Sequence, residues 1–335
     1  MRTIAPPLYQ GDTALRFAYP RHFKPLSRES SKNYARNMPL EFPVRRSILI
    51  TPGHAAARLA KAATLDVDAV AFDIEDGVPP EMKDDARAAI AEALRALDFG
   101  GRERIVRVNA IGAGALEQDL AALPLERVDT LFIPKVADAA AVAALDTRLG
   151  AIEAAAGLPR RIPLILTIET GEGLFNVAEI ARASDRTTAL FFGSGDYAAE
   201  TGCRITPETL QVPRALIAAA AGMAGIQAID AAYFLDVKDA EATRADAERA
   251  RDFGFSGKLL FHPNQIAATN AVFTPDPAAV ARAEKIIAAY EDAKARGEGT
   301  AVADGEFIAI DMLPPARRVL AVARHAGVIA ANRRD

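Results

Sequence analysis

The chain has 335 residues, with 40 Lys and Arg against 44 Asp and Glu, for a formal net charge of −4. No basic stripe stands out in its globular part, so a nucleic-acid partner is not expected. No apolar run approaches the roughly eighteen residues of a membrane span, and the N-terminus lacks a signal-peptide core, so a cytoplasmic protein without a membrane partner is expected. Cys203 is the only cysteine, which excludes an intrachain disulfide and a cysteine metal cluster.

Residues 1–44 differ in composition from the rest of the chain. They are rich in Pro, Arg and Tyr, and nine Lys and Arg stand against three Asp and Glu up to Arg46. An acid-poor, Arg-rich start is also typical of an organelle transit peptide, but the prolines and the lack of an amphipathic helix argue against one. We therefore interpret this segment as an extended arm that lies on the following domain or on a neighbouring subunit.

From residue 45 onward, short β-branched runs alternate with alanine-rich stretches of helical periodicity. Strands are predicted at 47–50, 68–73, 104–109, 130–135, 162–168, 188–193, 225–230 and 257–262. Helices are predicted at 55–65, 83–97, 116–123, 137–156, 207–223 and 240–253. Strand–helix units of this number and size predict a TIM (β/α)8 barrel over residues 45–275. A doubly wound sheet is the alternative, although it rarely needs eight strands so evenly spaced.

The remaining residues, 276–335, are too few for a second domain. A long helix is predicted at 276–296, a glycine-rich linker at 297–305 and a last helix at 314–331. We interpret this segment as a helical lid, or as an arm that reaches a neighbouring subunit.

Acidic residues follow two neighbouring predicted strands. The strand at 162–168 runs directly into Glu169, and the strand at 188–193 is followed by Asp196. The carboxyl ends of barrel strands carry the chemistry of this fold, and Mg²⁺ is bound by one or two carboxylates together with waters and substrate oxygens. The pair therefore predicts a magnesium site. The alternative is that both residues are helix N-caps at strand-to-helix turns.

Other polar residues also stand at predicted strand ends. They are Asp73, Glu75, Asp76, Arg107, Asn109, Lys135, Asp230, His262 and Asn264. Any one of them could be structural: Lys135 could simply extend to solvent, and His262 could be a cap. A ring of such residues at one mouth is harder to explain by packing, because burying unpaired charge is costly.

Arg107 has a planar fork that can hold a substrate carboxylate by two hydrogen bonds. Beside a metal ion, this suggests an α-keto or 2-hydroxy acid as the substrate, and making or breaking a carbon–carbon bond through an enolate as the reaction. A Schiff base on Lys135 is a less favoured alternative, since the surrounding acids would raise its pKa rather than lower it.

Eight segments of the chain resemble the citrate lyase beta subunit and malyl-CoA lyase family, within the metal-dependent aldolases of the phosphoenolpyruvate/pyruvate barrel class. They read RSILITPG at 46–53, DIEDGV at 73–78, RVN at 107–109, IPKV at 133–136, IET at 168–170, GSGD at 193–196, FHPNQ at 261–265 and FTPDP at 273–277. The resemblance extends from residue 45 to about residue 320. It implies a Mg²⁺-dependent carbon–carbon lyase that acts on a 3-hydroxyacyl-CoA such as malyl-, citramalyl- or citryl-CoA.

The resemblance also implies roles for individual residues. Glu169 and Asp196 would hold Mg²⁺, Arg107 would bind the oxo-acid end of the substrate, and Glu75 and Asp76 would order water at the metal. Arg46, Arg58 and Lys61 match the region where relatives bind the phosphates of coenzyme A, although basic residues on a helix are usually just a solvated face.

The C-terminal segment departs from the family. In the malyl-CoA lyase branch, the last Asp of an Asp-Gly-x-Met-Ile-Asp pattern completes the site of the neighbouring subunit. Here an ungapped match places Ala309 at that position, with Asp311 two residues later. Either a small shift lets Asp311 serve as the acid, or the chain lacks it. Since relatives form trimers or hexamers, a homotrimer or a multiple of it is expected.

Two other functions remain open at this point. A CoA-independent pyruvate or oxo-acid aldolase would use the same metal acids and Arg107 without any benefit from coenzyme A. A non-catalytic binding protein built on the barrel is a further alternative, and the intact metal acids argue against it.

Overall fold

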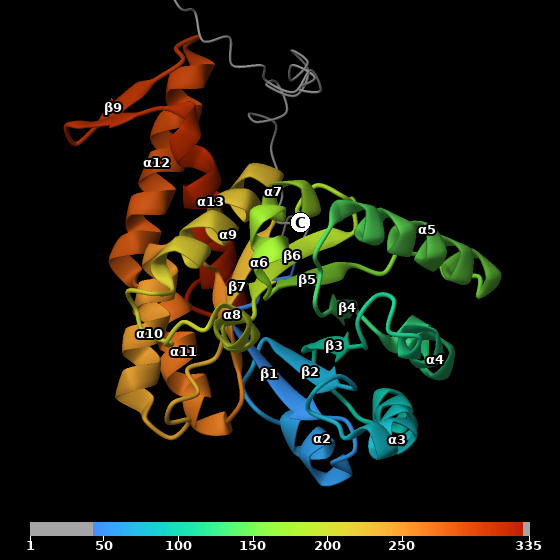
Figure 1. The fold of residues 1–335 in the computed structure, drawn as a ribbon. Helices are drawn as coiled ribbons and strands as arrows, with labels where there is room; N and C mark the ends of the chain where they lie inside the picture. Colours follow the sequence, from blue (N-terminus) through green and yellow to red (C-terminus); the bar gives the residue numbers. More distant parts are fainter. Residues whose placement is uncertain (1–42, 331–335) are drawn as a thin grey trace, which may run out of the picture. The chain divides into compact units, whose positions relative to one another are not determined.

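The computed structural model describes residues 43–330, so the arm predicted at 1–44 lies almost entirely outside the described residues. Eight parallel strands follow one another around a closed barrel in sequence order (Figure 1). They are β1 Ser47–Pro52, β2 Ala69–Asp73, β3 Glu103–Arg107, β4 Thr130–Ile133, β5 Leu164–Ile168, β6 Thr187–Phe192, β7 Gln227–Asp230 and β8 Gly257–Leu260. β1 pairs with both β2 and β8, which closes the barrel and confirms the predicted TIM-barrel fold.

Helices on the outside of the barrel connect consecutive strands, and one more helix, α11, follows the last strand (Figure 1). They are α2 Ala56–Ala62, α3 Lys83–Ala96, α4 Ala115–Ala122, α5 Ala139–Ala155, α6 Gly171–Phe175, α7 Val177–Ile180, α8 Ser194–Thr201, α9 Gln211–Ala224, α10 Ala240–Asp252 and α11 Ile266–Phe273. The prediction missed α6, α7, α8 and α11, because these short helices follow strand ends whose glycines and polar residues resemble loops. None of the helices between residues 43 and 330 combines the length and the apolar character that crossing a bilayer requires.

Side chains alternate between two apolar layers along each strand, as the two-residue period of β-structure requires. Inside the barrel, Ile48, Ala71, Ile105, Phe132 and Leu259 belong to one buried cluster. The intervening residues pack outward against the helices in a second, larger cluster. The barrel interior is therefore a filled core, and chemistry is confined to its two ends.

The amino-terminal end of the barrel is closed by Arg45, whose side chain is fully buried. Its guanidinium donates two hydrogen bonds to the Glu103 carboxylate, at 2.6 and 2.7 Å, and another to Gln227 Oε1 at 2.8 Å. A buried arginine is stable only when it is paired in this way. This end of the barrel is thus a structural plug.

The C-terminal segment consists of α12 Pro277–Ala295, a hairpin of β9 Ala301–Ala303 and β10 Glu306–Ile308, and α13 Leu313–His325. Its apolar residues form a third buried cluster of their own. The predicted glycine-rich linker was wrong in part, because residues 301–308 form the hairpin. Asp304 and Gly305 both have positive φ, which is the geometry of a two-residue hairpin turn and favours an Asp-Gly sequence.

Candidate functional site

The loop after β2 is shaped by the side chain of Asp73. Its two carboxylate oxygens accept hydrogen bonds from the backbone N–H groups of Glu75, at 2.8 Å, and Gly77, at 2.9 Å. A Cβ atom at Gly77 would collide with the same carboxylate, so glycine is required there. The loop therefore presents Glu75 and Asp76 in a fixed arrangement at the carboxyl end of the barrel.

Arg107, the last residue of β3, holds this loop from the neighbouring strand. Its Nε and Nη2 donate to the two oxygens of Asp73 at 2.7 Å each, and its Nη1 lies 3.1 Å from Glu75 Oε2. One edge of the predicted carboxylate-binding fork is thus occupied by Asp73. The N–H groups that remain on Nη1 and Nη2 are those available to a substrate.

Lys83, the first residue of α3, holds the same loop by binding backbone carbonyl groups of the loop with its side chain. Its ammonium group donates to the carbonyl oxygens of Ile74 and Glu75 and to Asn109 Oδ1. Sequence reasoning did not identify Lys83, because nothing distinguishes it from the other charged residues in the first turns of helices.

Lys135 lies just beyond β4 and contacts acids from two sides. Its backbone N–H donates to Glu169 Oε1 at 2.7 Å, and its Nζ donates to Glu75 Oε1 at 2.6 Å and to Asp76 Oδ2 at 3.0 Å. Burial lowers the pKa of Lys135, but the hydrogen bonds to Glu75 and Asp76 outweigh it, so the pKa is raised. A charged lysine is a poor Schiff-base nucleophile, in agreement with the prediction.

Glu169 and Asp196 come together at the same mouth. Glu169 is buried directly after β5, and Asp196 lies in the first turn of α8, after β6. Burial and then the adjacent Asp196 carboxylate raise the pKa of Glu169 to about 8. Two carboxylates held so close that one of them favours its protonated form are an arrangement that a cation would stabilise.

The donor set fits a hard divalent cation. Glu169 and Asp196 provide two carboxylates, and residues 43–330 contain no group of three or more His, Cys, Asp or Glu arranged to hold a metal by themselves. Mg²⁺ commonly takes one or two protein carboxylates and completes its octahedron with water or substrate. Gly193 makes room for the pair, because a Cβ atom there would lie 2.5 Å from Glu169 Oε2.

Asp230 does not belong to the mouth, and its place in the predicted ring was wrong. It follows Ile229, which points into the barrel, so its own side chain points outward. There it lies 2.8 Å from Arg214 and also pairs with Lys258, and Asp246 completes the buried group at 2.9 Å from Arg214. The alternation along β7 was the signal that could have excluded Asp230.

His262 is a helix cap, which was the alternative weighed for it. Its Nδ1 accepts a hydrogen bond from the N–H of Asn264 at 3.2 Å, and Gln265 completes a capping box. The structure thus gives His262 a structural partner within its own turn.

Arg46 cannot bind coenzyme A in the manner predicted. It lies before β1, at the amino-terminal end of the barrel, and its guanidinium binds Asp68 at 2.7 Å and Thr274 Oγ1 at 2.7 Å. Arg58 and Lys61 differ, since both are exposed on α2, which follows the carboxyl end of β1. Their assignment stays a prediction.

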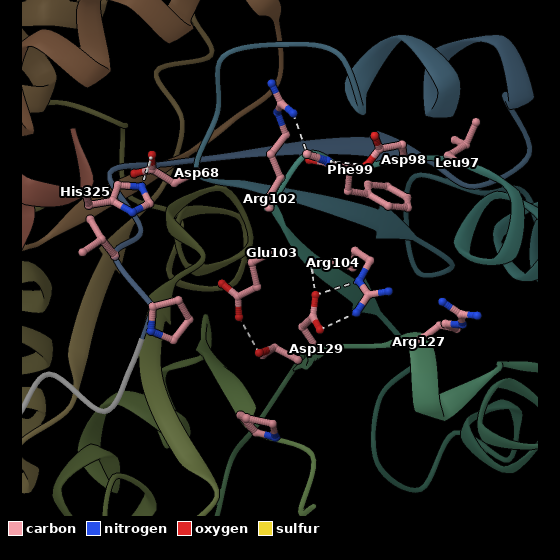
Figure 2. Close-up of a pocket in the computed structure, with 16 residues that line it drawn as sticks. Asp68, Leu97, Asp98, Phe99, Arg102, Glu103, Arg104, Arg127, Asp129 and His325 are labelled. Atoms are coloured by element: carbon pink, nitrogen blue, oxygen red, sulfur yellow. Dashed lines mark hydrogen bonds and ion pairs between the residues drawn. The ribbon is translucent and has the colours of Figure 1, made fainter. Parts of the chain in front are cut away.

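A cavity of about 760 Å³ opens at the amino-terminal end of the barrel, and Asp68, the partner of Arg46, is part of its lining (Figure 2). Its lining includes Asp68, Arg104 and His325, with Arg104 paired to Asp129 and His325 bonded to Asp68. None of the acids at the carboxyl end of the barrel, from Asp73 and Glu75 to Glu169 and Asp196, lines it. We place the candidate site at the carboxyl end of the barrel, because the paired carboxylates of Glu169 and Asp196 lie there and the pKa of Glu169 is raised.

Asp311 lies just before α13, within the turn Ile310–Met312, and lines a groove between α12 and α13. The groove also contains Asp276, Arg282 and Met312. The resemblance assigns the C-terminal acid to the site of a neighbouring subunit, and this role stays a prediction.

Residues 46–263 match the model of the HpcH/HpaI aldolase/citrate lyase family. The chain belongs to this family. The matched range runs from the residue before β1 to the turn after β8, so it covers the whole barrel and every acid of the mouth. The resemblance inferred from the sequence is confirmed.

Among curated relatives of this HpcH/HpaI family member, a (3S)-malyl-CoA thioesterase of Cereibacter sphaeroides is 40% identical over 280 residues, covering 83% of this chain and 94% of the relative. An L-malyl-CoA/beta-methylmalyl-CoA lyase of Rhodobacter capsulatus is 36% identical over 307 residues, covering 85% and 96%. Both relatives are thus matched over nearly their full length.

Two solved structures are similar to this chain in fold. The protein CitE of Mycobacterium tuberculosis, in complex with magnesium, acetoacetate and coenzyme A, is 30% identical with a TM-score of 0.64, covering 84% of this chain and 98% of that chain. RipC of Yersinia pestis is 35% identical with a TM-score of 0.57, covering 70% and 97%.

Proposed function

We propose that this family member is a Mg²⁺-dependent carbon–carbon lyase that cleaves a malyl-CoA-type thioester into an acyl-CoA and an oxo acid. The observation that carries the proposal is the juxtaposition of Glu169 and Asp196, with the pKa of Glu169 raised to about 8, at a mouth that also holds Arg107. The relatives named as malyl-CoA enzymes and the neighbour solved with magnesium and coenzyme A support the choice of ligand.

In the proposed reaction, a base takes the proton of the substrate hydroxyl and the bond between the carbinol carbon and its CH₂ neighbour breaks. The bonding electrons pass to the thioester side as an enolate, which takes up a proton to give the acyl-CoA, and the carbinol carbon becomes the carbonyl of the oxo acid. For malyl-CoA the products are acetyl-CoA and glyoxylate. When bound, Mg²⁺ supplies Lewis-acid stabilisation of developing negative charge.

The residues of the chain have distinct parts in this scheme. The free N–H groups of Arg107 bind the oxo-acid carboxylate. Burial raises the pKa of Glu75, whereas for Asp76 hydrogen bonds from Lys135 and Glu75 outweigh burial and lower it. Neighbouring acids with pKa values pushed apart are suited to giving and taking protons, so we assign proton transfer and the ordering of water to this pair.

A thioesterase is the second candidate, and two observations favour it. The curated relatives at 38% to 40% identity are named (3S)-malyl-CoA thioesterases. In addition, an ungapped match to the pattern implied by the resemblance places Ala309 where the lyase branch has its C-terminal acid, unless a small shift lets Asp311 serve. In this reaction water attacks the thioester carbonyl and the C–S bond breaks, which gives malate and free coenzyme A.

The experiment that tests the proposal follows the products formed from (3S)-malyl-CoA. We expect glyoxylate, measured as its phenylhydrazone, to appear in equal amount with acetyl-CoA. Free thiol without glyoxylate would establish the thioesterase instead. Cleavage of free malate or citramalate at the same rate as the thioester would favour the CoA-independent aldolase.

Variants of the proposed metal ligands test the site against a matched control. In Glu169→Gln we expect calorimetric Mg²⁺ binding to weaken by at least about 100-fold and product formation to fall in parallel, because a ligand is lost. Glu179→Gln on α7 changes an exposed glutamate in the same way and should alter neither quantity. Unchanged activity in Glu169→Gln would contradict the proposed site and revive the non-catalytic alternative.

We further propose a cytoplasmic homotrimer, or a multiple of it, with Asp311 reaching a neighbouring site and with Arg58 and Lys61 near the coenzyme A phosphates. Light scattering coupled to size exclusion tests the assembly.

Arg58→Ala should raise the KM for the thioester without changing kcat, since its contact is remote from the bond that breaks.

A further inference from the structure

Lys135 adopts a left-handed backbone conformation although it is not glycine. Its φ is 54°, and among residues 43–330 the only other non-glycine residue with positive φ is Asp304, in the hairpin turn. Every residue with a Cβ atom is disfavoured in this conformation, because the Cβ approaches the following carbonyl oxygen, but aspartate is tolerated since its short polar side chain can hydrogen-bond locally. Such residues persist where surrounding contacts hold them, and they gather at functional sites.

The unusual backbone gives Lys135 a hydrogen bond that a regular strand would not make. Its N–H donates to Glu169 Oε1 at 2.7 Å rather than to a backbone carbonyl of β5. One residue later, the N–H of Val136 bonds again to the β5 backbone, at Thr167 O, at 3.2 Å. The chain thus departs from the strand ladder at the residue whose N–H binds the buried Glu169 carboxylate.

The side chain of Lys135 reaches in the opposite direction, past β3 to the loop after β2. Its Nζ lies 2.6 Å from Glu75 Oε1 and 3.0 Å from Asp76 Oδ2. One residue therefore joins the acid after β5 to the acid pair after β2, by its backbone on one side and by its ammonium on the other.

Glycine would adopt the same backbone without strain, and it would keep the N–H bond to Glu169. The presence of lysine at a position that favours glycine indicates that the ammonium group has a function. The ion pair that it makes is half-buried, since the side chain of Lys135 is 42% exposed and that of Glu75 only 5%, so the stability and the activity of its variants have to be measured side by side.

We propose that Lys135 is a positioning residue that couples the Glu169 carboxylate to Glu75 and Asp76, so that the cation-binding and proton-transferring groups keep one relative geometry. The inference rests on the proposed function for the roles of these acids. Lys135 does not contact the bond that breaks; it acts through the acids.

Two variants separate the backbone from the side chain. Lys135→Ala keeps the backbone strain and removes the ammonium, whereas Lys135→Gly removes both. We expect both variants to lower kcat by about tenfold or more and to weaken calorimetric Mg²⁺ binding by about tenfold, with the KM for malyl-CoA within about twofold of wild type. We expect the Tm of Lys135→Gly to exceed that of Lys135→Ala, because only glycine relieves the strain.

A chemical rescue gives the sharpest test. Propylammonium supplies the three carbons and the nitrogen that Lys135→Ala lacks, and the exposed side chain leaves a path for it to enter. We expect it to restore kcat of this variant several-fold, while tetramethylammonium at equal concentration, which cannot donate hydrogen bonds, should not. Lys294→Ala, which removes an exposed lysine on α12, is the control and should match wild type throughout.

Three outcomes would overturn the coupling. They are wild-type kcat and Mg²⁺ affinity in Lys135→Ala, an activity loss that propylammonium does not reverse, or a loss accompanied by an equally lowered Tm in both variants, which would indicate a structural role. A wild-type chain that binds no Mg²⁺ would instead overturn the proposed function itself. The two failures are thus distinguishable.

Discussion

At the scale of single residues, the site depends on Gly193, which leaves room for the Glu169 side chain. Gly193 has an ordinary φ of −83°, so its importance is steric rather than conformational. Sequence reasoning identified the acids Glu169 and Asp196 but not this requirement. The space around an added Cβ atom depends on where β5 places Glu169, and no local pattern reveals that.

This steric requirement gives a testable expectation. In Gly193→Ala the new methyl group must displace the Glu169 side chain, so we expect Mg²⁺ binding to weaken by at least tenfold and stability to fall by about 1–3 kcal/mol. Titration calorimetry and urea unfolding measure the two effects. Gly222→Ala on α9 has open space around the added Cβ and should be neutral or slightly stabilising. Unaltered Mg²⁺ binding in Gly193→Ala would contradict the proposed position of Glu169.

At the scale of elements, side-chain direction decides which strand-end residues reach the mouth. The positions of the strands could be predicted from their apolar runs, and Asp73 and Arg107 lie on the inward face as Ala71 and Ile105 do. Asp230 has the opposite direction and links β7 to α9 and β8 through Arg214 and Lys258. The predicted ring of polar residues included Asp230 because it did not take into account that side chains alternate between the inward and outward faces of a strand.

The buried ion pairs of Asp230 allow its outward direction to be tested by mutation. Asp230→Asn leaves Arg214 and Lys258 with one carboxylate, that of Asp246, so we expect a loss of about 3 kcal/mol in unfolding free energy and no change in Mg²⁺ affinity. Asp292→Asn, at an exposed position of α12, should change stability by less than about 0.5 kcal/mol. If Asp230→Asn weakened Mg²⁺ binding and left stability intact, Asp230 would belong to the mouth after all.

At the scale of the whole molecule, the C-terminal segment is bound to the barrel far from the proposed site. His325, at the end of α13, lies 2.9 Å from Asp68, which also binds Arg46 before β1. Burial tends to raise the pKa of Asp68, but hydrogen bonds from His325 and Arg46 outweigh it and lower the pKa to about 2. No sequence pattern linked residues so far apart in the chain.

This contact makes stability depend on pH in acid. Because the pKa of Asp68 falls from 3.8 to about 2 on folding, its contribution is complete above about pH 4 and is lost as the pH falls toward 2. The difference of about 1.8 pKa units corresponds to roughly 2 kcal/mol. Between pH 4 and pH 2, we expect the free energy of unfolding of wild type, measured with urea, to fall by about 2 kcal/mol more than that of Asp68→Asn. Parallel pH profiles of the two proteins would show that Asp68 is not the group responsible.

The sequence by itself determined the barrel, the order of its strands and the acids that follow β5 and β6, because hydrophobic period and strand-end composition are local properties. It also carried the family motifs that the comparisons confirmed. Only the tertiary structure decided that Arg46 lies at the wrong end for coenzyme A, that Asp230 points outward, and that Lys135 joins two acidic groups. The physical reason is that direction and partnership depend on how distant strands meet, and this information is spread over the whole chain rather than held at any one position.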